Sequence, residues 1–162
     1  MPTFCYQGVR ALLDDLVERM SMEVRRVDVA DTPAVIAAAD GADVGWLESP
    51  TNPTLDLAGL PTILAACRAA GTATVADNTF AAPLGQQPLA LGATAVLRSG
   101  TKVSGGHSDL TIGLTVTPDD ALHARLVRSR CSAPRPAGSN RSSPCAACAH
   151  CRCDSNGALR TP

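Results

Sequence analysis

The sequence predicts an α/β fold with a mostly parallel sheet, and three features support this. Short apolar runs of strand length alternate with longer segments of helical periodicity. Glycine, proline and small polar residues separate these segments, as turns between βα units do. Polar residues also follow several apolar runs directly, which is where ligands sit beyond the carboxyl ends of parallel strands.

The first predicted element is a helix over residues 7–20, followed by a strand over 23–29. Four apolar residues of this helix fall on one face: Leu12, Leu13, Leu16 and Val17. A short helix is predicted over 32–39 because Asp31 or Thr32 can cap it and Pro33 suits its first position.

The next segments continue the alternation. Residues 43–47 read as a strand and residues 49–54 as a proline-bounded loop. A helix is predicted over 57–70, stopping at Gly71, and a buried strand over 73–76.

The remaining predicted elements lie between residues 88 and 128. A short helix over 88–91 ends at Gly92, and strands follow over 94–98 and 110–117. The last helix is predicted over 119–128.

The chain changes composition near Arg130. From Cys131 onward it contains a single leucine, Leu159, and no Val, Ile, Phe, Tyr, Trp or Met. Such a segment cannot bury enough apolar surface to offset the entropy lost on ordering. We therefore predict a folded domain over residues 1–129 and a disordered tail over 130–162.

Composition and charge also limit the kinds of binding partner and the cellular location that can be expected. A formal net charge of −1 without a basic face argues against a nucleic-acid partner. No apolar run is long enough to span a membrane, and no signal peptide is visible, so a cytoplasmic location is expected.

Polar residues end three of the predicted strands, at positions 48–53, 77–79 and 99–102. Lys102, in the third group, is the only lysine of the chain. Parallel strands would open all three groups onto one rim of the sheet. Each feature also has a purely structural interpretation: a solvated lysine, turn residues at Asp77 and Asn78, and capping hydroxyls at Ser99 and Thr101.

Several separated blocks share an order and spacing with a known family. They are Glu48-Ser-Pro-Thr-Asn-Pro53, Asp77-Asn-Thr-Phe80, Pro88-Leu-Ala-Leu-Gly92 and the run from Ser99 to Asp109. Together they resemble the Cys/Met metabolism (trans-sulfuration) family of pyridoxal-phosphate-dependent enzymes, over roughly residues 4–128. The resemblance implies part of the large domain of the fold-type-I pyridoxal-phosphate-dependent transferases.

The resemblance implies roles for particular residues. Lys102 would hold pyridoxal 5'-phosphate and then move protons on the substrate. Asp77 would pair with the pyridine nitrogen, Ser99 and Thr101 would donate hydroxyls to the phosphate, and Tyr6 would stack on the ring.

Asn52 would approach the ring hydroxyl and the carboxylate of the substrate, a small sulfur amino acid. The implied activity is C–S bond chemistry of the cystathionine γ-synthase, cystathionine γ-lyase or methionine γ-lyase type, in a homotetramer. The family's subunit is longer and carries a small domain with the arginine that binds the substrate carboxylate. We therefore expect impaired or absent turnover, the alternative being an inactive remnant of such an enzyme.

The tail invites two interpretations. Shifting its implied codons by one position permits Arg-Gly-Leu-Arg-Thr-Leu, which resembles the family's continuation, so we infer an out-of-frame tail. Its cysteines and histidine suggest a small zinc-binding protein instead: Cys145, Cys148, His150, Cys151 and Cys153. Their spacing is too tight for a zinc finger with two separated ligand pairs, which disfavours zinc.

Overall fold

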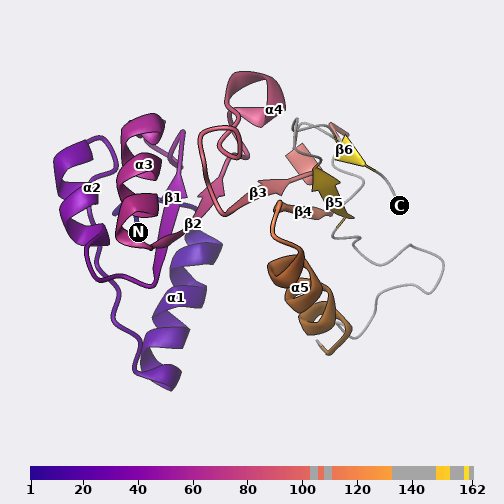
Figure 1. Cartoon of the computed structure of the whole chain (residues 1–162), viewed down its shortest axis with the longest axis horizontal. Helices are drawn as coiled ribbons and strands as arrows, with labels where there is room; N and C mark the ends of the chain where they lie inside the picture. Colours follow the sequence, from indigo (N-terminus) through magenta and orange to yellow (C-terminus); the bar gives the residue numbers. More distant parts are fainter. Residues whose placement is uncertain (103–105, 108–110, 133–148, 154–158, 161–162) are drawn as a thin grey trace.

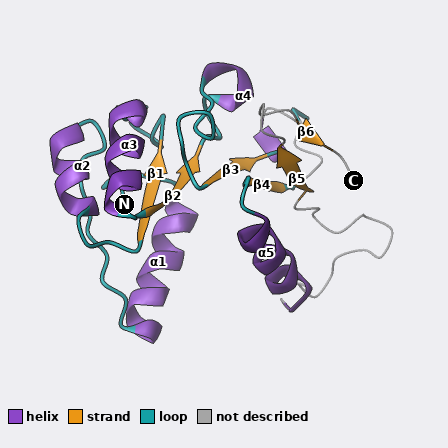
Figure 2. Ribbon diagram, viewed as in Figure 1, coloured by secondary structure: helices purple, strands orange, loops and turns teal. Residues whose placement is uncertain are grey.

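The computed structural model describes residues 1–102, 106–107, 111–132, 149–153 and 159–160 (Figure 1). Helices and strands alternate through most of this part of the chain (Figure 2). The predicted α/β class with a mostly parallel sheet is confirmed, and the sheet is mixed because two of its described strands run opposite to the others.

The strands lie in the sheet in their order along the chain. Their bounds are β1 Val44–Glu48, β2 Ala73–Asp77, β3 Ala95–Ser99, β4 Gly113–Val116, β5 Ala149–Cys153 and β6 Leu159–Arg160. The first three are parallel, whereas β4 is antiparallel to β3. Strand β5 is parallel to β4, and β6 is antiparallel to β5.

The register of the parallel strands brings their carboxyl ends together. Glu48 of β1 is the partner of Asp77 of β2, and Asp77 is the partner of Leu97 of β3. Strand β3 continues two residues beyond that pair, to Ser99. The polar residues after β1, β2 and β3 therefore share one edge of the sheet, as predicted.

Helices α2, Thr32–Ala39, and α3, Leu60–Ala70, lie side by side against the β1 and β2 end of the sheet (Figure 1). The Asp31 side chain caps α2 by accepting a hydrogen bond from the Ala34 amide at 3.0 Å. Gly71 ends α3 in the left-handed conformation, at φ +77°, which glycine adopts without steric cost.

Helix α3 begins three residues later than the predicted start at residue 57. Pro61 stands in its first turn, where its missing amide hydrogen costs no helical hydrogen bond. The preceding segment is held elsewhere, because the Ala58 amide donates to Ser49 Oγ at 3.1 Å.

The hydrophobic core lies between these two helices and the sheet. Its buried members are Val35, Ala39, Leu47, Leu60, Ile63, Leu64, Cys67, Ala76, Ala93 and Val96. Burying one Ile or Leu side chain contributes about 1.5–3 kcal/mol, so this cluster is the main source of stability for this end of the domain.

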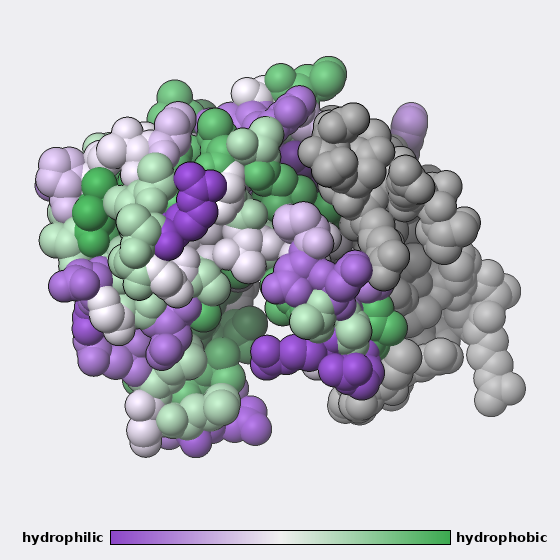
Figure 3. Space-filling model, in the orientation of Figure 1, coloured by the Kyte–Doolittle hydropathy of each residue, from purple (hydrophilic) through white to green (hydrophobic). Residues whose placement is uncertain are grey.

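Helix α1, Gln7–Met20, has the predicted bounds but buries none of its residues. Its predicted apolar face includes Leu12, which is 56% exposed, and Val17. Hydrophobic side chains also lie on the surface over α4, at the top of the space-filling view (Figure 3).

The predicted strand over residues 23–29 is wrong. The structure forms a single parallel bridge there, between Pro2 and Val27. Two hydrogen bonds make this bridge, from the Thr3 amide to the Val27 carbonyl and from the Val27 amide to the Met1 carbonyl. The chain bends at Thr3 and Phe4, so the pairing does not extend into a ladder.

The predicted helix over residues 88–91 is also wrong, since that segment forms turns that close with the Gly92 amide donating to the Leu89 carbonyl. A four-residue helix, α4, Ala82–Gly85, occupies a segment in which no helix was predicted. Gln86 and Gln87 separate the two segments, and Gly92 takes φ +99°, a conformation that a helix cannot continue.

The end of the chain combines described and undescribed segments. Helix α5, Asp120–Ser132, is capped by Asp119, whose Oδ1 accepts from the amides of Ala121 and Leu122 at 2.8 and 3.0 Å. Within the range expected to be disordered, the structure describes the last turn of α5, β5 and β6. Strand β5 adds to the sheet by pairing in parallel with β4.

The rest of that range lies outside the described residues, including Cys145 and Cys148. Within the residues described, no group of histidines, cysteines and acidic residues could hold a metal ion. Among the same residues, no helix has the length and apolar character to cross a membrane.

Candidate functional site

Two buried carboxyl groups end the first two strands. Glu48 is 4% exposed and Asp77 is 8% exposed, and the register places them directly beside one another. The Ser49 amide donates to the Asp77 carbonyl at 3.3 Å, which continues the pairing by one step. Buried acidic groups at the carboxyl edge of parallel strands are placed to meet a ligand.

Asp77 is held by the residue two positions after it. Its Oδ1 accepts hydrogen bonds from the Thr79 amide at 3.0 Å and from Thr79 Oγ1 at 2.6 Å. Both donors approach the same carboxylate oxygen, so they fix the orientation of the carboxylate plane. Among the described residues, no hydrogen bond reaches the other oxygen, Oδ2.

Ser99, at the end of β3, is tied to the same threonine. Its amide donates to Thr79 Oγ1 at 2.9 Å. Thr79 therefore connects the carboxylate at the end of β2 to the backbone at the end of β3.

Thr101 faces the strand that runs in the opposite direction. Its Oγ1 accepts from the Ile112 amide at 2.9 Å and makes a longer contact of 3.5 Å with the Ile112 carbonyl. The hydroxyl of Thr101 is thus part of the junction between β3 and β4. It could donate to a phosphate by giving up only the longer of these contacts.

Lys102 lies three residues beyond the end of β3 and is exposed to solvent. Its carbonyl accepts a hydrogen bond from the Gly106 amide at 3.0 Å. The ion pairs of Arg19, Arg25 and Arg26 lie elsewhere, near α1 and the segment that follows it. The exposed amine of Lys102 is accordingly accessible for reaction.

Tyr6 comes to the same edge of the sheet from the start of α1. Its amide donates to both carboxylate oxygens of Glu48, at 2.9 and 3.2 Å. Its ring is 56% exposed and lies against Gly8, where an added Cβ would come within 2.7 Å of Cε1. Glu48 therefore anchors the backbone of Tyr6 while its ring stays available.

Glu48 has an altered acidity. Burial has the largest effect and raises the pKa of its carboxyl group, and the nearby Asp77 charge raises it further. Backbone hydrogen bonds from Tyr6 and Asn52 lower the pKa, but the net shift is upward. The Asn52 side chain is half-buried in the loop that follows β1. Asn52 and Tyr6 thus meet at the same buried carboxyl group.

Asn78 is fully buried behind this edge. Its Nδ2 donates to the carbonyls of Ala82 and Gln86, at 3.1 and 2.9 Å, while its Oδ1 has no partner within the described residues. The Asn78 side-chain amide therefore links α4 and the residue after it to the end of β2.

Sequence reasoning did not assign a role to Glu48 or Thr79. Both stand inside the quoted blocks, beside Ser49 and Asn78, so their position in the motifs was the available signal. Their bonds join residues 42 and 20 positions apart, which no local pattern reveals.

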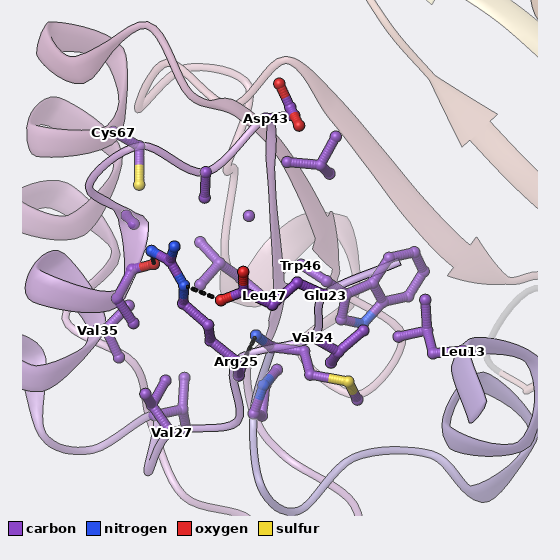
Figure 4. Close-up of a pocket in the computed structure, with 18 of the residues that line it drawn as sticks. Leu13, Glu23, Val24, Arg25, Val27, Val35, Asp43, Trp46, Leu47 and Cys67 are labelled. Atoms are coloured by element: carbon purple, nitrogen blue, oxygen red, sulfur yellow. Dashed lines mark hydrogen bonds and ion pairs between the residues drawn. The ribbon is translucent and has the colours of Figure 1, made fainter. Parts of the chain in front are cut away.

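A cavity of about 410 Å³ lies elsewhere, beside β1 (Figure 4). Trp46 and Leu47 of β1, Val35 of α2 and Cys67 of α3 line it, and Arg25 reaches into it. None of the six predicted site residues lines this cavity. Its walls are mainly apolar, so it lacks the groups that the predicted chemistry needs.

The residues at the carboxyl edge fit pyridoxal phosphate by their chemistry. The carboxylate of Asp77 has one oxygen left for a ring nitrogen, and Lys102 offers an exposed amine. Ser99 and Thr101 supply hydroxyls, and Tyr6 supplies an exposed aromatic ring. These are a counter-charge, a nucleophile, phosphate donors and a stacking surface.

Comparison with known proteins agrees with this chemistry. Residues 1–149 match the model of the family described as Cys/Met metabolism PLP-dependent enzyme, a longer stretch than residues 4–128. A probable cystathionine gamma-synthase from Herpetosiphon aurantiacus is 41% identical over 122 residues, which are 75% of this chain and 38% of that protein.

Solved structures show the same likeness. The crystal structure of metB from Corynebacterium glutamicum has a TM-score of 0.74 and 36% identity, covering 81% of this chain and 34% of that one. Cystathionine gamma synthase from Xanthomonas oryzae pv. oryzae, in complex with cystathionine, has a TM-score of 0.72 and 35% identity, covering 78% and 33%. The chain thus spans little more than a third of the relatives that it matches.

Proposed function

Because this chain belongs to the Cys/Met metabolism family of PLP-dependent enzymes, we propose that it binds pyridoxal phosphate at the carboxyl edge of β1, β2 and β3. The bound cofactor would serve C–S bond chemistry on a small sulfur amino acid. The shared edge of the three strand ends supports the proposal, since Asp77 ends β2 and Ser99 ends β3 at this edge, with Lys102 three residues further along the chain.

Each residue has a distinct part in the proposed site. Lys102 holds the cofactor through its side-chain nitrogen, and Asp77 Oδ2 accepts a hydrogen bond from the pyridine nitrogen. Ser99 and Thr101 donate to the phosphate, and the Tyr6 ring covers one face of the pyridine. The exposed amine and ring and the buried, oriented carboxylate support these assignments.

Asn52 completes the proposed site from the loop after β1, where it contacts the ring hydroxyl and the substrate carboxylate. Glu48 holds the Tyr6 backbone in place and does not touch the substrate.

In the reaction, pyridoxal phosphate supplies an electron sink that makes the hydrogen on the substrate Cα acidic. Once the substrate amino group has replaced Lys102 on the cofactor, the freed Lys102 amine would accept that proton and return it later in the cycle. The C–S bond at the γ or β carbon of the substrate would then break, its electron pair leaving with the sulfur as a thiol, or an incoming nucleophile would take the place of the leaving group. Cystathionine, which the Xanthomonas oryzae enzyme binds, represents the substrate class.

Trapping of the cofactor tests the binding step. The purified chain is incubated with pyridoxal phosphate, reduced with borohydride, digested and analysed by mass spectrometry. Since Lys102 is the only lysine, the expected label lies in one peptide, and Lys102→Arg abolishes it while keeping the positive charge. A label found solely on the amino-terminal nitrogen would contradict the proposal.

A second function, cofactor binding without turnover, is favoured by the 38% coverage of the relative. The resemblance implies that the arginine for the substrate carboxylate lies in a small domain outside the stretch matched here. We expect little or no release of keto acid from cystathionine by this chain alone, and we infer that the homotetramer implied by the resemblance does not assemble from it. Assay of keto acid with the cofactor-loaded chain before any borohydride reduction, and light scattering for the mass in solution, separate these outcomes.

A further inference from the structure

We propose that Thr79 is a positioning residue of the cofactor site, which aligns the Asp77 carboxylate with the end of β3. This inference rests on the proposed function, because it concerns the same edge of the sheet. It adds a residue to which neither the motifs nor the comparisons give a role.

The geometry of a single hydroxyl group carries the proposal. Thr79 Oγ1 donates its hydrogen to Asp77 Oδ1 at 2.6 Å and accepts one from the Ser99 amide at 2.9 Å. The Thr79 amide donates to the same Oδ1 at 3.0 Å. The Thr79 hydroxyl is therefore both a donor and an acceptor, and it cannot rotate without breaking one of these hydrogen bonds.

Two consequences follow for a bound ring. The two donors at Oδ1 direct Oδ2 of Asp77 toward whatever the carboxylate binds. The acceptor role toward Ser99 sets the spacing between β2 and β3 beyond their last register pair, Asp77 with Leu97. Thr79 thus fixes the distance from the group that meets the ring nitrogen to the backbone that leads to Lys102.

Three substitutions at Thr79 distinguish the contribution of the hydroxyl group from that of the side-chain volume. Thr79→Val keeps the shape and removes the hydroxyl, so Asp77 keeps one donor and the Ser99 amide loses its acceptor. Thr79→Ser restores both bonds. Thr79→Ala replaces the valine variant if that variant does not fold, because alanine adds no branched group.

The matched control lies between the same two strands, at their other end. Thr94 Oγ1 accepts from the Thr74 amide at 3.0 Å, so it too is a hydroxyl that joins β2 to β3. Thr94→Val removes a comparable bond far from Asp77. It measures what a loss of sheet stability alone does to cofactor binding.

The experiment compares two probes by the change in their absorbance on titration. One is pyridoxal phosphate, and the other is its 1-deaza analogue, in which a C–H group replaces the ring nitrogen. A hydrogen bond to a charged group, once lost, is expected to weaken pyridoxal phosphate binding about 10- to 100-fold in Thr79→Val. The 1-deaza analogue, which gives Asp77 no partner, should lose less than about 3-fold.

Thr79→Ser should bind both probes like the unaltered chain, and Thr94→Val should change both equally. Equal losses for the two probes in Thr79→Val, or no loss for either, would overturn the role of Thr79. If the unaltered chain binds neither probe and Lys102 takes no label, the proposed function itself fails, and this inference fails with it.

Discussion

Glu48 and Asp77 are partners in the β1–β2 register, and both of their carboxyl groups are buried at the carboxyl end of the sheet. The pair is not symmetrical. Asp77 is oriented by Thr79, whereas Glu48 accepts both of its main hydrogen bonds from the Tyr6 amide. The Asp77 carboxyl group is therefore held by a neighbour in the sequence, and the Glu48 carboxyl group holds the residue that precedes α1.

The raised pKa of Glu48 predicts how stability depends on pH. Between its ordinary pKa and the raised value, the folded chain holds more protons than the unfolded chain, so stability falls as pH increases. A tenfold difference in proton affinity between the folded and unfolded chain corresponds to about 1.4 kcal/mol of unfolding free energy. Glu48→Gln removes this contribution and should make the stability curve flatter in that window.

Urea unfolding of the unaltered chain and of Glu48→Gln, between pH 4 and pH 7, measures the difference. The control is Glu18→Gln on exposed α1, which should track the unaltered chain. Parallel curves for Glu48→Gln and the unaltered chain would show that Glu48 titrates as it does in the unfolded state.

Gly100→Ala should destabilise the junction of β3 and β4. An added Cβ at Gly100 would come within 2.6 Å of Ile112 Cγ2, and Gly100 is buried. Moving Ile112 aside is expected to cost about 1–3 kcal/mol of unfolding free energy. Gly113→Ala, where no atom lies within 4 Å of the added Cβ, is the control and should stay within about 0.5 kcal/mol. Similar values for the two variants would refute the crowding at Gly100.

Ile63→Ala should lower the unfolding free energy by about 2–5 kcal/mol, because this side chain is 0% exposed in the core. Leu84→Ala is the comparison, since Leu84 is 99% exposed and should change stability by less than about 0.5 kcal/mol. Chemical denaturation followed by circular dichroism gives both values. A loss at Leu84 as large as that at Ile63 would mean that α4 packs against another surface.

Helix α1 should open more readily than α3. It buries no residue, whereas α3 buries Leu60, Ile63, Leu64 and Cys67. Local opening is easiest where few apolar contacts hold an element. Hydrogen exchange measured by mass spectrometry should therefore show faster uptake in peptides from α1, and equal protection of the two helices would contradict this.

The elements that rest on local signals were predicted closely. The Asp31 cap and Pro33 mark α2, Gly71 ends α3, and apolar runs mark β1, β2 and β3. The strand over 23–29 was not predictable, because a strand needs a partner and the pairing found within the described residues is a single bridge to Pro2. A pattern of alternating residues does not specify whether such a partner is available.

The candidate site likewise has a part that the sequence predicts and a part that only the folded structure shows. Lys102, Asp77 and the blocks around them could be recognised in the chain itself, because the chemistry of a residue and its neighbours in the motif are local properties. The bonds from Tyr6 to Glu48 and from Ser99 to Thr79 required the folded structure. They arise when parallel strands pair in one register and bring distant segments within hydrogen-bonding distance, and pairing of that kind is a property of the whole sheet.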